Sequence, residues 1–143
     1  MTDLDRATAF WSAALDLSPA DEWSSPDWCT LVGVDGARVL AVMTSASPPE
    51  PHPRLHLDLV VDTTAEQDAE VRRLIALGAT EVDWDSYPPE PDFVVLADPD
   101  GNLSASSTSA GLPPVAPHRE QRPYFGSSTK TGISRSVFSW YSA

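Results

Sequence analysis

The residues with the clearest chemical potential lie in the segment 54–61, where apolar and polar side chains alternate. His56 and Asp58 fall on the same face of the strand that this alternation predicts, and the leucines fall on the other face. A neutral imidazole binds divalent metal ions well, and a neighbouring carboxylate could act as a base or hold the ring by a hydrogen bond. We therefore interpret His56 as a candidate metal ligand and Asp58 as a candidate ligand-binding residue.

Other readings of this pair remain open. His56 could be a solvated or hydrogen-bonded strand residue that lines an empty concave surface, and Asp58 could be a surface carboxylate. A metal centre that also binds substrate needs about three protein ligands. The sequence identifies no catalytic residue, so it does not decide between an enzyme and a binding protein.

Two tryptophans on predicted strands, Trp28 and Trp84, could form flat walls of a pocket for a planar ligand. Packing in the core is the competing explanation for both. The segment Gly33–Gly36 lacks the lysine and the Ser/Thr of a nucleotide-binding loop, and no motif supports serine-histidine nucleophilic catalysis. The binding candidates are therefore His56, Asp58, Trp28 and Trp84.

Charge and composition exclude several classes of function. The formal net charge of -12 argues against nucleic acid, because lysine and arginine drive phosphate binding. No apolar run approaches the ~20 residues of a membrane helix, and the amino terminus does not resemble a signal peptide, so we expect a cytoplasmic protein without a membrane partner. Cys29 is the only cysteine, which excludes an internal disulfide.

Periodicity predicts an order of elements that occurs twice. Apolar spacing indicates helices over about 4–16 and 65–77. Alternation and turn residues indicate strands over 28–32, 38–43, 54–61, 79–84 and 93–97. A proline-rich run, 45–53, separates the two halves. The first half therefore reads helix, strand, strand, and the second half reads strand, helix, strand, strand.

Four segments in this order resemble the glyoxalase/bleomycin resistance protein/dioxygenase (vicinal oxygen chelate) superfamily, and most closely its glyoxalase-like domain subgroup. Asp3–Trp11 is similar to the first helix of that family, and Arg54–Leu59 is similar to the strand that opens its second module. Leu77–Ala79 is similar to a helix end, and Val95–Asn102 to the turn before the last strand. Together these segments span residues 3 to 102.

The resemblance implies an α+β fold of two paired βαβββ modules whose curved sheets form a cup, with His56 facing into it. It also implies that His56 could hold one divalent metal ion of unknown identity, in a lyase, isomerase or dioxygenase that acts on a small molecule. The alternatives are a metal-free, drug-sequestering protein of the resistance type and an inactive truncated relative. Relatives often place a glutamate where this chain has Ala105, and their first strand would precede Asp3.

We expect a glyoxalase-like domain over 3–103, with module one at 3–45 and module two at 54–103. The segment 104–143 is predicted to be an atypical, poorly ordered tail, because serine, proline and glycine dominate it. A frameshift near residue 104 is a further hypothesis, since codons for the serine-rich run can read Cys-Val-Val-Asp in a neighbouring frame. A homodimer is also predicted, because a truncated sheet leaves unpaired edges.

Overall fold

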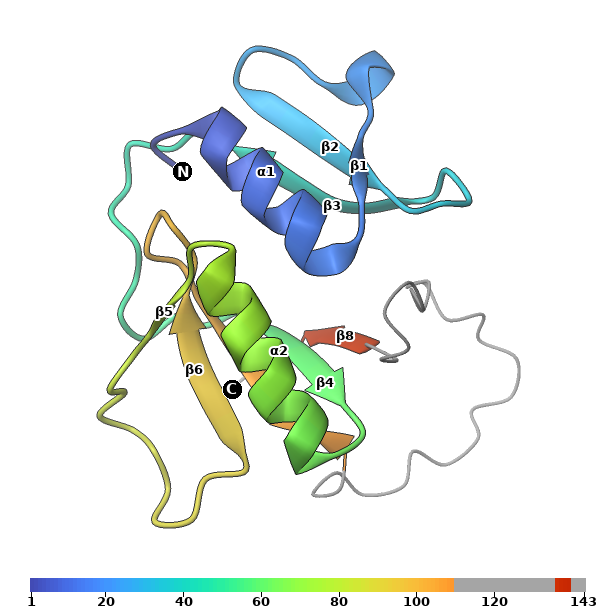
Figure 1. Ribbon diagram of the computed structural model, residues 1–143. Coiled ribbons are helices and arrows are strands. Elements are labelled where there is room, and N and C mark those ends of the chain that lie inside the picture. Colours follow the sequence, from blue (N-terminus) through green and yellow to red (C-terminus); the bar gives the residue numbers. More distant parts are fainter. Residues whose placement is uncertain (110–135, 140–143) are drawn as a thin grey trace.

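The computed structural model describes residues 1–109 and 136–139, which form two helices and two β-sheets (Figure 1). Module one contains α1 (Leu4–Leu15), β1 (Ser18–Pro19), a 3-10 turn (Asp21–Trp23), β2 (Trp28–Val32) and β3 (Arg38–Met43). Module two contains β4 (Leu57–Val61), α2 (Thr64–Ala76), β5 (Thr80–Glu81), β6 (Phe93–Ala97) and β7 (Leu103–Thr108). A final strand, β8 (Ser136–Ser139), follows.

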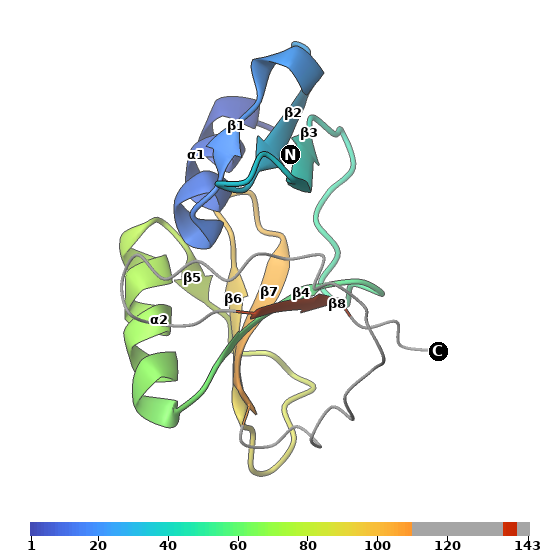
Figure 2. The same cartoon turned by 90° about the vertical axis from the view of Figure 1, so that its right-hand side faces the viewer.

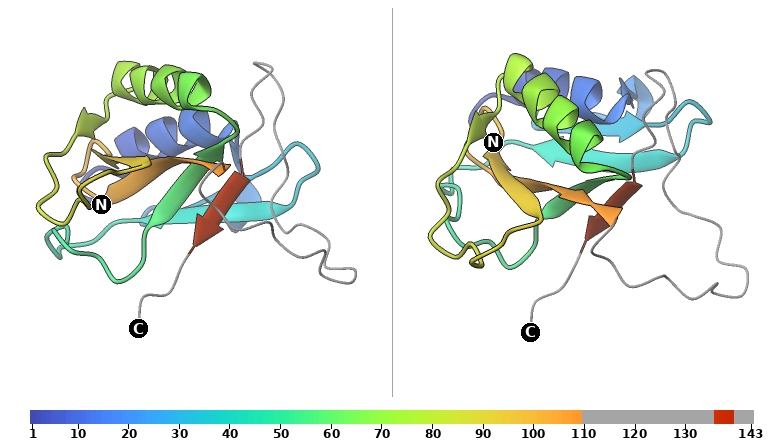
Figure 3. Two further views of the ribbon diagram at one scale, coloured as in Figure 1. Left: turned by 90° about the horizontal axis from the view of Figure 1, so that it is seen from below. Right: turned by 60° about the horizontal axis from the view of Figure 1, so that its bottom comes forward.

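The two sheets have related topologies. The first has the order β1-β2-β3 and is antiparallel throughout. The second has the order β5-β6-β7-β4-β8, in which β4 is parallel to β7 and antiparallel to β8. Both helices lie on the same side of the sheets (Figures 2 and 3). This arrangement confirms the predicted α+β fold and leaves one face of each sheet without a helix.

Each helix begins at a capping residue that the sequence supplies. The Asp3 side chain accepts a hydrogen bond from the Arg6 backbone N–H at the start of α1. Thr63 and Glu66 form a reciprocal capping box at the start of α2. These interactions satisfy N–H groups that have no partner within the helix, and each is typically worth about 1 kcal/mol. The predicted helices, 4–16 and 65–77, are therefore confirmed to within one residue at each end.

A single hydrophobic core joins the two modules. Trp11 and Leu31 from module one pack in the same buried cluster as Leu59 and Leu74 from module two. Burying a side chain of this size contributes about 1.5 to 3 kcal/mol. The modules therefore form one domain.

Polar contacts also hold the modules together. The Arg73 guanidinium of α2 donates to the Ala13 and Ala14 carbonyl oxygens at the end of α1, and it pairs with the fully buried Glu70 carboxylate. The Trp11 indole N–H of α1 donates to the buried Asp98 carboxylate at 3.0 Å. The second half of the first helix is thus anchored to module two.

The end of the domain lies further along the chain than the predicted residue 103. Ser104–Thr108 continue β7, which lies between β4 and β6, and the side chain of Ser106 is fully buried. The serine-rich composition led to the wrong prediction for these residues. Backbone hydrogen bonds to two neighbouring strands hold a central strand in place whatever its side chains are. Residues 110–135 and 140–143 lie outside the described part of the chain, so the predicted tail is untested there.

Two further strands differ from their predicted bounds. The strand predicted for 54–61 begins at Leu57, and the strand predicted for 79–84 is limited to Thr80–Glu81. In the second case a single extra hydrogen bond, from the Val82 N–H to the Val95 carbonyl, extends the pairing. Among residues 1–109 and 136–139, no helix combines the length and the apolarity that a membrane crossing requires.

Candidate functional site

The helix-free face of module two contains a cavity of about 430 Å³. Its walls come from the proline-rich linker, from β4, from the connection between β5 and β6, and from β6 and β7. The lining residues described by the structure are His52, Pro53, His56, Asp58, Trp84, Asp92, Phe93, Val95, Leu103, Ser104, Ala105, Ser107 and Thr108. A cavity of this size falls within the usual range for small-molecule sites, roughly 300 to 1,000 Å³.

Strand register explains why polar groups of β4 reach the cavity. Asp58 lies opposite Ala105 of β7, and Ala105 lies opposite Val95 of β6, so these three residues form a row across the sheet. Because side chains alternate along a strand, Leu57 and Leu59 point to the other face, where the core with α2 lies. The predicted division of this strand into a polar and an apolar face is therefore what places His56 and Asp58 at the cavity.

His56 and Asp58 form a pair at the cavity wall. The His56 Nε2 atom lies 3.3 Å from the Asp58 Oδ1 atom, and the Asp58 side chain is 15% exposed. Burial raises the pKa of the Asp58 carboxyl above its usual value, and the nearby His56 charge opposes this effect. A carboxylate and an imidazole in this geometry can accept a hydrogen bond from a ligand or exchange a proton with it.

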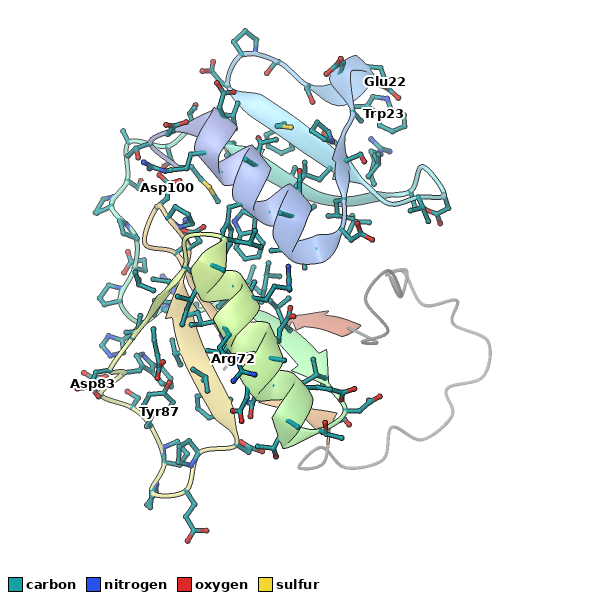
Figure 4. The ribbon with its side chains drawn as sticks, in the orientation of Figure 1. Glu22, Trp23, Arg72, Asp83, Tyr87 and Asp100 are labelled. Atoms are coloured by element: carbon teal, nitrogen blue, oxygen red, sulfur yellow. The ribbon has the colours of Figure 1, made fainter. Side chains whose placement is uncertain are left out.

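An aromatic cluster adjoins the cavity, and two of its rings, Trp84 and Phe93, line it. The Trp84 ring makes edge contacts with Tyr87 and Phe93, with centroids 6.0 and 6.2 Å away. The Tyr87 hydroxyl oxygen accepts a hydrogen bond from the Val95 N–H, which fixes the connection between β5 and β6 against the sheet (Figure 4). These rings give the cavity a rigid apolar side that suits a planar ligand.

His52 comes from the linker, and sequence analysis assigned it no role. Its ring lies 6.5 Å from Trp84, and its Nε2 atom lies 2.9 Å from the Asp85 carboxylate. Hydrogen bonds from His52 and Ser86 hold the pKa of Asp85 below its usual value. The sequence signal that could have identified His52 is the proline-rich run itself, since it must cross to module two beside the start of β4.

The side chains at the cavity do not fit a divalent metal ion. Within the described residues, no three histidine, cysteine, aspartate or glutamate side chains come together in a group that could hold one. His56 and Asp58 supply two donors, and the neighbouring position across the ladder is Ala105, whose methyl group cannot bind metal. A metal ion that also binds substrate needs about three protein ligands, so the described part of the cavity does not supply a metal centre.

Trp28 does not contribute to this cavity. It lines a separate open hollow of about 400 Å³ on module one, with Trp23 and Arg38. The Arg38 guanidinium lies 5.0 Å from the centre of the Trp23 ring, and Figure 4 shows Trp23 and Tyr87 at opposite ends of the molecule. Of the candidates from sequence, the structure brings together His56, Asp58 and Trp84. The predicted shared cup is not seen, because no described residue of module one lines the cavity.

The order of the elements, the parallel β4–β7 pairing and the cavity on the open face define a glyoxalase-type fold. The glyoxalase-like domain family model matches residues 1–105, and the chain belongs to that family. The match confirms the predicted resemblance to the vicinal oxygen chelate superfamily. No curated protein sequence matches this chain.

Solved structures show the same fold. A glyoxalase/bleomycin resistance protein/dioxygenase family enzyme from Burkholderia phytofirmans PsJN has a TM-score of 0.56 and 19% identity, over 76% of this chain and 91% of that chain. The fosfomycin resistance protein FosX from Listeria monocytogenes has a TM-score of 0.56 and 19% identity, over 75% and 83%. A glyoxalase-related enzyme from Fulvimarina pelagi has a TM-score of 0.55 and 20% identity, over 76% and 81%. At these identities the comparisons establish the fold and not the ligand.

Proposed function

We propose that the chain binds a small planar organic molecule of neutral or positive charge in the cavity of module two, without a metal ion. The observation that carries this proposal is the composition of the cavity wall. Trp84 and Phe93 supply flat apolar surface, and the His56–Asp58 pair supplies polar groups. The combination of an apolar body and a few polar groups is typical of small-molecule sites.

The charged residues around the cavity restrict the charge that its ligand can carry. Asp58 and Asp92 line the cavity, and no lysine or arginine is present among the described lining residues. An anionic ligand would lose its hydration there and would find no lysine or arginine to pair with it. The formal net charge of -12 adds a long-range preference for positive ligands.

The competing proposal is a metal-dependent lyase, isomerase or dioxygenase. Its support is that His56 faces the cavity and that the FosX proteins and the family enzyme above share the fold. It requires donors beyond His56 and Asp58. Metal analysis of the purified protein separates the two proposals: a stoichiometric divalent ion that is lost in His56→Ala would favour the enzyme.

Calorimetric titration with two probes of equal shape and opposite charge tests the binding proposal. 1-Naphthylmethylammonium should bind with saturation in the presence of a chelator, and 1-naphthoate should bind at least about tenfold more weakly. If both probes bind equally well, or if binding of the cation requires added metal, the proposal fails.

Two matched variants locate the binding. Asp58→Asn should weaken the cation by about 10- to 100-fold, because a hydrogen bond to a charged group is worth about 1.5 to 3 kcal/mol. Asp83→Asn removes the same charge from an exposed residue that does not line the cavity (Figure 4), and it should leave the affinity within about twofold.

A further inference from the structure

The linker between the modules forms one side of the module-two cavity with few attachments of its own. His52 and Pro53 line the cavity, and the linker passes on the same side of module two as the connection 82–92 between β5 and β6 (Figure 1). Four of its residues have no backbone N–H to donate, namely Pro48, Pro49, Pro51 and Pro53. Among the described residues, His52 makes the only hydrogen bond that joins the segment 48–55 to another part of the chain. This segment, the strap, is therefore tied to module two at one point.

That point is an ion pair at the edge of the cavity. The His52 Nε2 atom lies 2.9 Å from the Asp85 Oδ1 atom, and the two side chains are 56% and 73% exposed. The His52 ring also lies 6.5 Å from the ring of Trp84, which lines the same cavity. The strap and the connection therefore meet where the cavity reaches the surface, and separation of His52 from Asp85 would free the strap there.

The charge on this pair depends on pH near neutrality. Hydrogen bonds from His52 and Ser86 hold the pKa of Asp85 below its usual value, so this carboxylate keeps its charge in mildly acidic solution. An imidazole ordinarily gains and loses its proton between pH 5 and 8. On the acidic side of this range the contact is a full ion pair, and on the basic side a neutral ring faces the carboxylate. The contact therefore weakens as the pH rises.

Other charged side chains and one other histidine lie on the segments that meet at His52. Those that line the cavity, or stand within two residues of the pair along the chain, are Glu50, Arg54, His56, Asp58, Asp83 and Asp92. Among the described residues, His52 forms an ion pair with Asp85 alone. Because His56 also carries an imidazole, its titration has to be separated from that of His52.

We propose that the strap is a pH-dependent cover of the cavity, which the His52–Asp85 pair closes on the acidic side of neutral pH and releases on the basic side. Because both side chains are largely exposed, loss of the imidazole charge should lower the ratio of closed to open molecules by about two- to fivefold. No second hydrogen bond of the described strap opposes this release. The open form gives a ligand a wider path to the cavity.

Proton NMR of the full-length chain tests the proposal through nuclear Overhauser effects between the rings of His52 and Trp84. These signals should be present at about pH 5.5 and should weaken by about a third to a half at about pH 8.5. Asp85→Asn removes the charge that holds the imidazolium, so in this variant the signals should be weak and nearly independent of pH. The measurement uses no ligand, so its outcome is independent of the ligand proposed above.

Two control variants separate the pair from its neighbours. Asp83→Asn removes the same charge from an exposed residue of the same connection, and His56→Gln removes the other imidazole of the cavity. Both should keep the pH dependence of the unaltered protein. The proposal is overturned if the signals of the unaltered protein are absent or do not change with pH. It is also overturned if Asp85→Asn keeps the full pH dependence, or if His56→Gln abolishes it.

Discussion

Modules one and two repeat an element order but present different surfaces on their open faces. In module two, β4 precedes the helix, pairs with β7 and brings His56 and Asp58 to the wall of a cavity. In module one the position beside β3 is taken up only by Met1, at one end of the strand, among the described residues. Its open face carries a shallow hollow with the exposed rings of Trp23 and Trp28. The two open faces therefore differ in their surfaces, since one carries a cavity with polar groups and the other a shallow hollow lined by tryptophans.

The two modules also have different roles in the domain. Module two carries the polar groups that could recognise a ligand, whereas α1 of module one packs against it through Trp11 and through the Arg73 contacts. Because the same core includes both modules, damage to their contact should unfold the whole domain, whereas changes at the cavity should affect binding alone.

The largest effect is expected at the contact between the helices. Arg73→Ala should lower the free energy of unfolding by about 3 to 5 kcal/mol, because the buried Glu70 carboxylate loses the arginine that neutralises it. Urea denaturation measures this loss. Arg72→Ala, on the exposed neighbouring position of α2 (Figure 4), should change stability by less than about 0.5 kcal/mol. Equal effects of the two substitutions would contradict the proposed link between the modules.

A second prediction concerns the cavity and pH. Because burial raises the pKa of Asp58, binding of 1-naphthylmethylammonium should weaken as the pH falls through that raised pKa, above the ordinary aspartate value of about 4. Protonation removes the negative charge that the cation needs. Calorimetry between neutral and acidic pH measures the change, and Asp58→Asn should flatten the profile. An unaltered profile in that variant would exclude Asp58 as the group responsible.

The smallest effect is expected at Asp100, which ties the amino terminus to module two. Its carboxylate accepts hydrogen bonds from the Thr2 N–H and hydroxyl and from the Arg6 guanidinium. Burial alone would raise the pKa of Asp100, but these hydrogen bonds and the Arg6 charge lower it overall. A lowered pKa in the folded state means that the stabilisation is present above the unfolded value of about 4 and is lost as the pH falls through the folded pKa.

Asp100→Asn should therefore lower the free energy of unfolding at neutral pH by about 1 to 2 kcal/mol. It should also make stability less dependent on pH in the acidic range, which thermal unfolding at several pH values measures. A variant that loses stability with acid as steeply as the unaltered protein would show that Asp100 does not contribute to this dependence.

Local patterns predicted the elements that position the site. Alternation along 54–61 separated His56 and Asp58 from the leucines, and apolar spacing placed both helices. Composition misled at Ser104–Thr108, because a central strand is held by backbone bonds to β4 and β6 that no local pattern shows. His52 and Phe93 reach the cavity through tertiary packing. Trp28 and Trp84 lie on similar local patterns, and only the arrangement of the two sheets separates them.

The most direct test is a two-dimensional nitrogen-proton NMR titration of the labelled protein with 1-naphthylmethylammonium. We expect saturable shifts of amide signals in β4, β6 and β7 and at Trp84, with the signals of β2 and of Trp23 and Trp28 unchanged. Saturable shifts centred on Trp23 and Trp28, or no saturable shifts in module two, would contradict the assignment of the binding site to module two.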